Sequence, residues 1–248
     1  MIYVIGDIHG CFDEFQDMLE LIKFDPETDE MYFVGDYIDR GKDSCKMLDF
    51  IDQHYDDECF HFIRGNHEDE FASYVRLLYS IDSKKSLLEL CDILHDKTQY
   101  FDMYGTIKNM LSDESIRDHV NTRLKRWASM FEQMPLHIIF RHNDTSYVIT
   151  HAGYPLSLRG IDIEEFSLYS REEALSKGGR KHSTIISGHT PTVIPGTFAY
   201  NQGKVFEYYN EEIDCRFYDI DCGACLKNKY DNARLACMRL DDNKIFYV

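Results

Sequence analysis

The chain has 248 residues, 44% hydrophobic and 29% charged, which is the composition of an ordinary globular protein. Its formal net charge of −17 argues against a general nucleic-acid binder, because affinity for a phosphate backbone requires clustered Lys and Arg. No apolar run approaches the length of a membrane span, so we expect neither a nucleic-acid nor a membrane partner.

Residues 1–63 alternate between strand and helix patterns. Short apolar runs predict strands over residues 2–5, 31–34 and 60–63, and apolar residues recurring every three or four positions predict helices over residues 11–24 and 44–55. This order is typical of a parallel sheet with crossover helices. Polar blocks follow the strands at their carboxyl ends, where open α/β sheets place their ligand crevices.

The rest of the chain divides into a helical stretch and a strand-rich stretch. Residues 70–134 are interpreted as a helical insertion that either packs on one flank of the core or forms a cap over the substrate. A hairpin is predicted from residues 136–140 and 147–150, and a helix over residues 171–175. Later strands, the last four of them antiparallel, are predicted over residues 184–186, 205–209, 216–220, 235–240 and 245–248. We therefore interpret residues 1–248 as a single domain.

Most of the eight cysteines are scattered singly among apolar neighbours. Their even number allows a disulfide framework. However, the chain enters its first strand without a basic or long apolar signal region, so we expect a reduced, cytoplasmic protein. For Cys222 and Cys225 we favour packing in a strand over a zinc or redox role, because no second cysteine pair lies at a suitable spacing.

Five polar blocks, each just after a predicted strand, carry candidate metal ligands. They span residues 6–10, 35–41, 64–68, 150–153 and 187–190. Asp7 and His9 are two positions apart, so on an extended segment their side chains point to the same face. The two carboxylate oxygens of Asp36 can bridge two metal ions. His151 and His189 complete the ligands of a second metal.

The same blocks offer groups suited to phosphate binding and proton transfer. Asp39 can orient a histidine by accepting its ring N–H, and the planar fork of Arg40 suits phosphate oxygens, unless the two form a plain surface ion pair. Asn66 supplies an amide oxygen as a hard ligand. The adjacent His67 is positioned to give a proton to a leaving group.

The order of these motifs resembles the phosphoprotein phosphatase family of the calcineurin-like metallophosphoesterase superfamily. The motifs are Gly-Asp-x-His-Gly, Gly-Asp-x-x-Asp-Arg-Gly, Gly-Asn-His-Glu, His-Ala-Gly and Gly-His-Thr, and the likeness is greatest to bacteriophage-lambda-like and bacterial serine/threonine protein phosphatases. Residues 169–172 and 219–224 resemble two further family segments. The resemblance implies an α/β fold, a metallophosphoesterase-type β-sandwich of two mixed sheets flanked by helices, with the insertion at residues 70–134.

The resemblance also implies two divalent metal ions, with Mn expected and Fe or Zn also suited to these ligands. The metal ligands would be Asp7, His9 and a bridging Asp36 for the first ion, and Asp36, Asn66, His151 and His189 for the second. A hydroxide bridging the two ions would attack phosphorus.

Proton donation and phosphate binding are implied for other motif residues. His67, oriented by Asp39, would protonate the departing alkoxide. The phosphate-binding residues would be Arg40, Arg171 and Asn66. Arg64 either joins them or pairs with a neighbouring carboxylate.

We expect hydrolysis of phosphoserine or phosphothreonine in a protein, or of a small phosphoester. The first alternative is a bis(5'-nucleosyl)-tetraphosphatase, that is, a diadenosine tetraphosphate hydrolase, which shares the motifs. An alternative from another class is a catalytically silent phosphate-binding module, which the presence of six ligands and His67 opposes. Residues 70–134 and 197–215 look longer than in compact members, so the family's substrate preference transfers poorly. The sequence indicates no oligomeric state.

Overall fold

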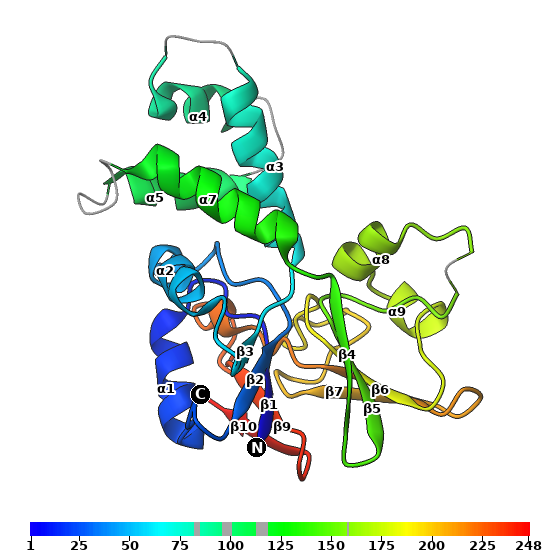
Figure 1. The fold of residues 1–248 in the computed structure, drawn as a ribbon. Coiled ribbons are helices and arrows are strands. Elements are labelled where there is room, and N and C mark those ends of the chain that lie inside the picture. The colour runs from blue at the N-terminus through cyan, green and yellow to red at the C-terminus, as the bar shows by residue number, and fades with distance from the viewer. Residues whose placement is uncertain (82–84, 96–100, 113–118, 158) are drawn as a thin grey trace.

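The computed structural model describes residues 1–81, 85–95, 101–112, 119–157 and 159–248 (Figure 1). One of its two mixed sheets has the strand order β10-β9-β1-β2-β3. These strands are β1 (Ile2–Ile5), β2 (Glu30–Phe33), β3 (Phe60–His61), β9 (Ala236–Arg239) and β10 (Lys244–Tyr247). The first three run parallel, and β9 pairs antiparallel with both β1 and β10.

The second sheet has the strand order β4-β5-β6-β8-β7. Its strands are β4 (His137–His142), β5 (Thr145–Thr150), β6 (Ser183–Ser187), β7 (Phe206–Asn210) and β8 (Cys215–Asp219). The predicted hairpin is confirmed as β4 and β5. The expectation that the last four strands are all antiparallel is wrong for β8, which runs parallel to β6. A hydrophobic pattern marks a strand but not its neighbour, and β8 pairs between β6 and the edge strand β7.

Alternate side chains of the first sheet face different layers. Tyr3 and Ile5 lie in the large core with the helices α1 (Phe12–Ile22) and α2 (Ser44–His54), which cover the outer face of this sheet (Figure 1). Val4, between them in sequence, packs in a second core with residues of β5, β6 and β8. The strand period of two therefore builds a helix layer on one face and a sheet-on-sheet layer on the other.

The helical insertion is confirmed. Its described residues form α3 (Asn66–Ser80), α4 (Leu87–His95), α5 (Phe101–Ser112) and α7 (Val120–Gln133). These helices project beyond the two sheets at the top of Figure 1. Trp127 of α7 is fully buried among them and anchors this part of the core.

Three short helices complete the described chain. The helix predicted over residues 171–175 is found as α9 (Glu173–Ser176), and α8 (Ile163–Tyr169) precedes it. Cys225 lies in the 3-10 helix η1 (Ala224–Leu226), and Cys222 follows β8, so the prediction that this pair packs within a strand is wrong. Cys222 is nevertheless buried between the two sheets. Among the described residues, no helix combines the length and apolar character needed to cross a bilayer.

Candidate active site

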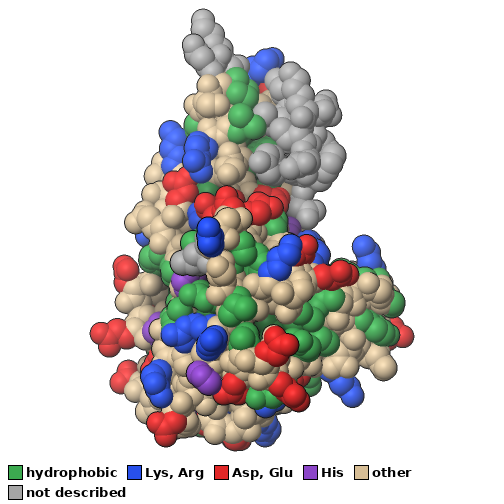
Figure 2. Space-filling view, turned by 90° about the vertical axis from the view of Figure 1, so that its right-hand side faces the viewer, with side chains coloured by type: hydrophobic (Ala, Val, Ile, Leu, Met, Phe, Trp, Pro, Cys, Tyr) green, Lys and Arg blue, Asp and Glu red, His purple; other side chains and the backbone are tan. Residues whose placement is uncertain are grey.

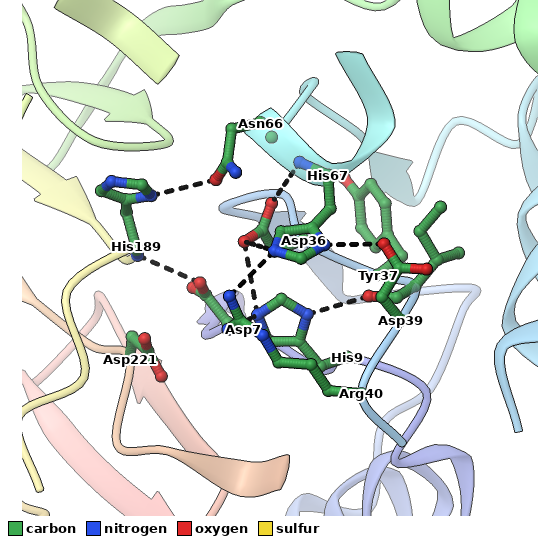
Figure 3. A network of polar contacts seen from close by, with 12 residues as sticks. Asp7, His9, Asp36, Tyr37, Asp39, Arg40, Asn66, His67, His189 and Asp221 are labelled. Carbon is green, nitrogen blue, oxygen red and sulfur yellow. Dashed lines mark hydrogen bonds and ion pairs between the residues drawn. The ribbon is translucent and has the colours of Figure 1, made fainter. Parts of the chain in front are cut away.

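Figure 3 shows residues of four of the five polar blocks facing one another, and Nε2 of His151, from the remaining block, lies 3.1 Å from Nδ1 of His189. Asp7 follows β1 and Asp36 follows β2, while Asn66 opens α3 just beyond β3. His151 and His189 follow the neighbouring strands β5 and β6 of the second sheet. All five side chains are buried. The junction of the two sheets therefore brings together residues that are up to 182 positions apart in sequence.

The backbone at this junction is unusually bent. Five of its residues other than glycine have positive φ angles, and these residues are His9 (46°), Asp36 (54°), Asp39 (68°), Arg40 (64°) and His189 (72°). A left-handed conformation costs roughly 1–3 kcal/mol for such residues and persists only where the surroundings enforce it. Here it turns each side chain from the end of its strand into the common site.

Four side-chain oxygen and nitrogen atoms that can bind a metal converge at one side of the site. The amide oxygen of Asn66 lies 2.9 Å from Nε2 of His151 and 3.0 Å from Nδ1 of His189, and these two nitrogens are 3.1 Å apart. Oδ1 of Asp36 lies 3.4 Å from Nε2 of His151. His151 donates its Nδ1–H to the carbonyl of Val34, which leaves a lone pair on Nε2 in the neutral ring.

The protonation of these imidazoles follows from their surroundings. Burial lowers the pKa of His151, and burial together with His151 lowers the pKa of His189 well below its usual range. Both rings are thus neutral at physiological pH, and the lone pair on Nε2 of His151 faces Nδ1 of His189 and the carboxylate of Asp36. A cation between these acceptors would relieve that conflict, and nitrogen and oxygen donors of this kind suit a divalent transition metal.

A second group of acceptors adjoins the first through Asp36. His9 donates Nδ1–H to the carbonyl of Ile38 at 2.8 Å, so its Nε2 carries the lone pair, 3.3 Å from Oδ2 of Asp36. The guanidinium of Arg40, itself a cation, donates to this Nε2 at 2.7 Å. Burial lowers the pKa of His9 well below normal, and Arg40 lowers it further.

Asp7 adjoins this group, whose mutually close donor atoms are those of His9, Asp36 and His67. Its Oδ2 accepts the backbone N–H of His189 at 3.0 Å, while its Oδ1 is buried without a partner among the described residues. Burial and then Asp221 and Asp36 raise the pKa of Asp7 well above normal, the response of a carboxylate that lacks a nearby cation. The unpartnered oxygen of Asp7 and the close donor atoms around Asp36 are a donor set that fits divalent metal ions.

His67 and Asp39 form a buried pair beside these groups. Nδ1 of His67 lies 2.7 Å from Oδ2 of Asp39, and Thr106 of α5 donates to the other oxygen of Asp39. Burial opposes a charge on the ring, but Asp36 and the bond to Asp39 outweigh it and raise the pKa of His67 to about 9. A guanidinium nitrogen of Arg40 lies 2.9 Å from Nε2 of His67 and donates to it when the ring is neutral.

The other arginines differ in their surroundings. Arg171 donates to the hydroxyl of Thr190, next to His189, at 3.2 Å. Arg64 forms ion pairs with Asp69 at 3.2 Å and with Glu164 at 2.5 Å. The structure therefore has Arg64 paired with carboxylates, the second of the two interpretations of this residue.

Three residues at the site received no role from the sequence. Glu68 is fully buried behind Asp36, and its position in the Gly-Asn-His-Glu motif was the available signal. Asp221 is buried near Asp7, one of its oxygens has no partner among the described residues, and it belongs to the segment of residues 219–224. No motif in the sequence marked Thr106, because it lies 67 positions from its partner Asp39.

An acidic cleft adjoins the site between α3 and α8. It has a volume of about 460 Å³ and is lined chiefly by Asp69, Glu70, Asp162, Glu164 and Glu165, with Tyr169 at its wall. The amide of Asn66 lies 3.5 Å from Glu70, which connects the cleft to the site. Figure 2 shows acidic side chains gathered across the neck between the insertion and the sheets.

Comparison with known families agrees with this geometry. Residues 1–193 match the family described as calcineurin-like phosphoesterase. The chain belongs to the calcineurin-like phosphoesterase family. This confirms the family expected from the motifs. Divalent metals are used across the family, in keeping with the paired acceptor groups around Asp36.

Relatives within this calcineurin-like family carry two different names. A symmetrical bis(5'-nucleosyl)-tetraphosphatase of Buchnera aphidicola is 40% identical over 240 residues, covering 96% of this chain and 64% of the relative. The serine/threonine-protein phosphatase 1 of Salmonella typhimurium is 27% identical over 198 residues, covering 77% of this chain and 78% of the relative. Across the tetraphosphatases matched, this chain covers between 18% and 64% of the relative's length.

The fold has solved counterparts. A serine/threonine phosphatase structure from Saccharomyces cerevisiae aligns with a TM-score of 0.52 at 16% identity, covering 100% of this chain and 78% of that one. At this identity the likeness speaks for the fold alone. It confirms the expected α/β architecture of two mixed sheets flanked by helices.

Proposed function

We propose that this protein is a phosphoester hydrolase that uses two divalent metal ions. The observation that carries the proposal is the convergence of neutral imidazoles, an amide oxygen and carboxylates on Asp36, beside the His67–Asp39 pair. The proposed metal ligands are Asp7, His9 and Asp36 for one ion and Asp36, Asn66, His151 and His189 for the other. Close donor atoms support His9 with Asp36 and the set of Asp36, His151 and His189, and the unpartnered Oδ1 supports Asp7. When bound, two such ions supply a water of lowered pKa as nucleophile and offset charge on the phosphate.

The side chains around the ligands then bind the phosphate and donate the proton. Arg40 and Arg171 bind the phosphate oxygens, for which their planar forks of donors are suited. His67 gives its proton to the leaving oxygen, and Asp39 keeps the ring in one orientation through its 2.7 Å bond. Thr106 in turn holds Asp39, so the insertion contributes to the position of the proton donor. Mn is the metal we propose, since oxygen and imidazole donors predominate.

For the substrate we propose a dinucleoside tetraphosphate, cleaved symmetrically into two nucleoside diphosphates. The support is the Buchnera relative of that name, whose 40% identity extends over 96% of this chain. The leaving group of a dinucleoside tetraphosphate is a phosphate oxygen, which needs less proton donation than an alkoxide does.

The acidic cleft favours a second candidate, a protein phosphatase acting on phosphoserine or phosphothreonine with basic residues alongside. Five carboxylates line the cleft, and one of them, Glu70, lies a single helical turn beyond Asn66. A peptide with Lys or Arg next to the phosphorylated residue would place positive charge there, whereas a polyphosphate chain would be repelled.

Parallel assays separate these candidates. The protein is stripped with chelator, supplied with Mn²⁺, Fe²⁺ or Zn²⁺, and offered a diadenosine tetraphosphate, a phosphopeptide with flanking arginines and an aryl phosphate. We expect the highest kcat/KM for the dinucleotide with Mn²⁺, and nucleoside diphosphate as its sole nucleotide product. Preference for the phosphopeptide would establish the second candidate. Failure to hydrolyse any of the three would reject the hydrolase proposal.

A further inference from the structure

We infer that Glu68 is a positioning residue that holds the backbone of Asp36 in the one conformation from which its carboxylate serves both metal groups. The inference rests on the proposed function, since it concerns the ligand that the two groups share. The carboxylate of Glu68 is hydrogen-bonded to the backbone of Asp36 and its surroundings, so it acts on the site through Asp36.

Glu68 accepts three backbone hydrogen bonds from two separate segments. Its Oε2 accepts from the N–H of Asp36 at 2.8 Å and of Gly65 at 3.0 Å, and its Oε1 accepts from the N–H of Tyr37 at 2.9 Å. The side chain is fully buried in the first turn of α3. The carboxylate therefore ties the loop after β2 to the start of α3, the two segments that carry Asp36 and Asn66.

Asp36 requires such a hold because its backbone is in the left-handed region, with φ of 54°. This turn directs the N–H groups of Asp36 and Tyr37 into the protein, where an unpaired N–H costs about 1–3 kcal/mol. The same turn sets Oδ1 of Asp36 3.4 Å from His151 and Oδ2 3.3 Å from His9. A small rotation of this residue would withdraw one oxygen from one of the two groups.

Glu68 and Asp36 pack closely against Gly65. A Cβ added at Gly65 would lie 2.3 Å from Oδ1 of Asp36 and 2.8 Å from Oε2 of Glu68. Oδ1 of Asp36 also accepts the N–H of His67 at 3.1 Å. The start of α3, Glu68 and Asp36 thus form one closely packed unit.

The chemistry of the side chain also points to a specific requirement. All three partners of Glu68 are backbone N–H donors, which suits a carboxylate with two acceptor oxygens. A glutamine would fill the same volume. It has only one acceptor oxygen, however, and its NH₂ group would meet the N–H of Tyr37 donor to donor.

Amide hydrogen exchange in the metal-free protein directly tests the hydrogen bonds from these backbone N–H groups to Glu68. In the wild type we expect the amides of Asp36, Tyr37 and Gly65 to exchange at least tenfold more slowly than amides of exposed loops, although none lies in a strand. Glu68→Gln should accelerate the Tyr37 amide at least tenfold, and Glu68→Asp, which is one methylene shorter, should accelerate all three. The control is Glu132→Gln, an exposed glutamate of α7 paired with Arg76, which should change none of them.

Metal binding gives the second measurement. Titration with Mn²⁺ should show a 10–100-fold loss of affinity in both Glu68 variants, the usual effect of removing a partner of a ligand. At saturating Mn²⁺ we expect kcat to fall while KM changes less than twofold. Wild-type amides that exchange like exposed loops, or variants that bind Mn²⁺ as the wild type does, would overturn the inference. A wild type that binds no Mn²⁺ would reject the proposed function. The exchange data would still test whether Glu68 fixes the backbone of Asp36.

Discussion

Replacing His67 by asparagine should separate proton donation from metal binding. The pKa of His67 is raised to about 9, so the ring carries a proton at neutral pH, and a protonated ring cannot serve as a metal ligand. Its Nε2 lies 3.9 Å from Oδ2 of Asp36, beside the shared carboxylate. An asparagine keeps a polar group at this position but has no proton to give. We therefore expect His67→Asn to retain both metal ions.

The size of the effect follows from the leaving group. General acid catalysis contributes roughly 10²–10⁴-fold, or about 3–5 kcal/mol of activation free energy. A phosphoserine peptide releases an alkoxide and should lose this whole factor in kcat/KM, while a nitrophenyl phosphate, whose leaving group needs no proton, should lose less than about tenfold. The assay compares both substrates and measures bound Mn. His182→Asn is the control, since this imidazole is 79% exposed and pairs only with Asp214 among the described residues. Equal losses on both substrates, or loss of a metal ion, would refute the role of His67 as proton donor.

Three further predictions follow from individual contacts. Arg40→Met should raise Mn²⁺ affinity at the His9 group several-fold, because the guanidinium no longer competes for Nε2, and calorimetry measures this change. The same variant should weaken inhibition by inorganic phosphate at least tenfold in inhibition kinetics. Gly188→Ala would place a Cβ 1.8 Å from Oδ1 of Asp7, so it should remove one equivalent of bound metal in elemental analysis. Glu165→Lys should lower kcat/KM for an arginine-flanked phosphopeptide at least fivefold and leave hydrolysis of an aryl phosphate within twofold.

Much of the fold could be predicted because its signals are local. The strand predicted over residues 2–5 is confirmed as β1, and the helix predicted over residues 44–55 is confirmed as α2, one residue shorter. Pairing is harder to predict, since hydrophobic alternation is the same whichever strand lies alongside. For this reason the alternation in β8 could not reveal that it runs parallel to β6.

The site residues, too, could be predicted where their signal is local in the sequence. Residues such as Asp7 and His9 lie in short motifs whose residue types and spacing are enough to suggest a ligand pair. Glu68 is in such a motif too, but its partners are backbone N–H groups, which every sequence has and which therefore leave no signal. Thr106 reaches Asp39 from a helix far away in sequence, and only the packing of the insertion brings them together.

The electrostatics of the cleft bear on which substrate can be used. Around Asp36 the proposed metal ligands would receive cations and, with Arg40 and Arg171, an anionic phosphate. Four residues after Asn66, at Glu70, the wall has already become acidic, and it remains acidic across to α8. A polyphosphate that passes this wall is repelled by it, whereas a peptide with basic residues gains by lying along it. The sign of the change in kcat/KM for the dinucleotide in Glu165→Lys consequently reports its path: an increase means that the polyphosphate passes this wall, and no change means that it leaves on the other side.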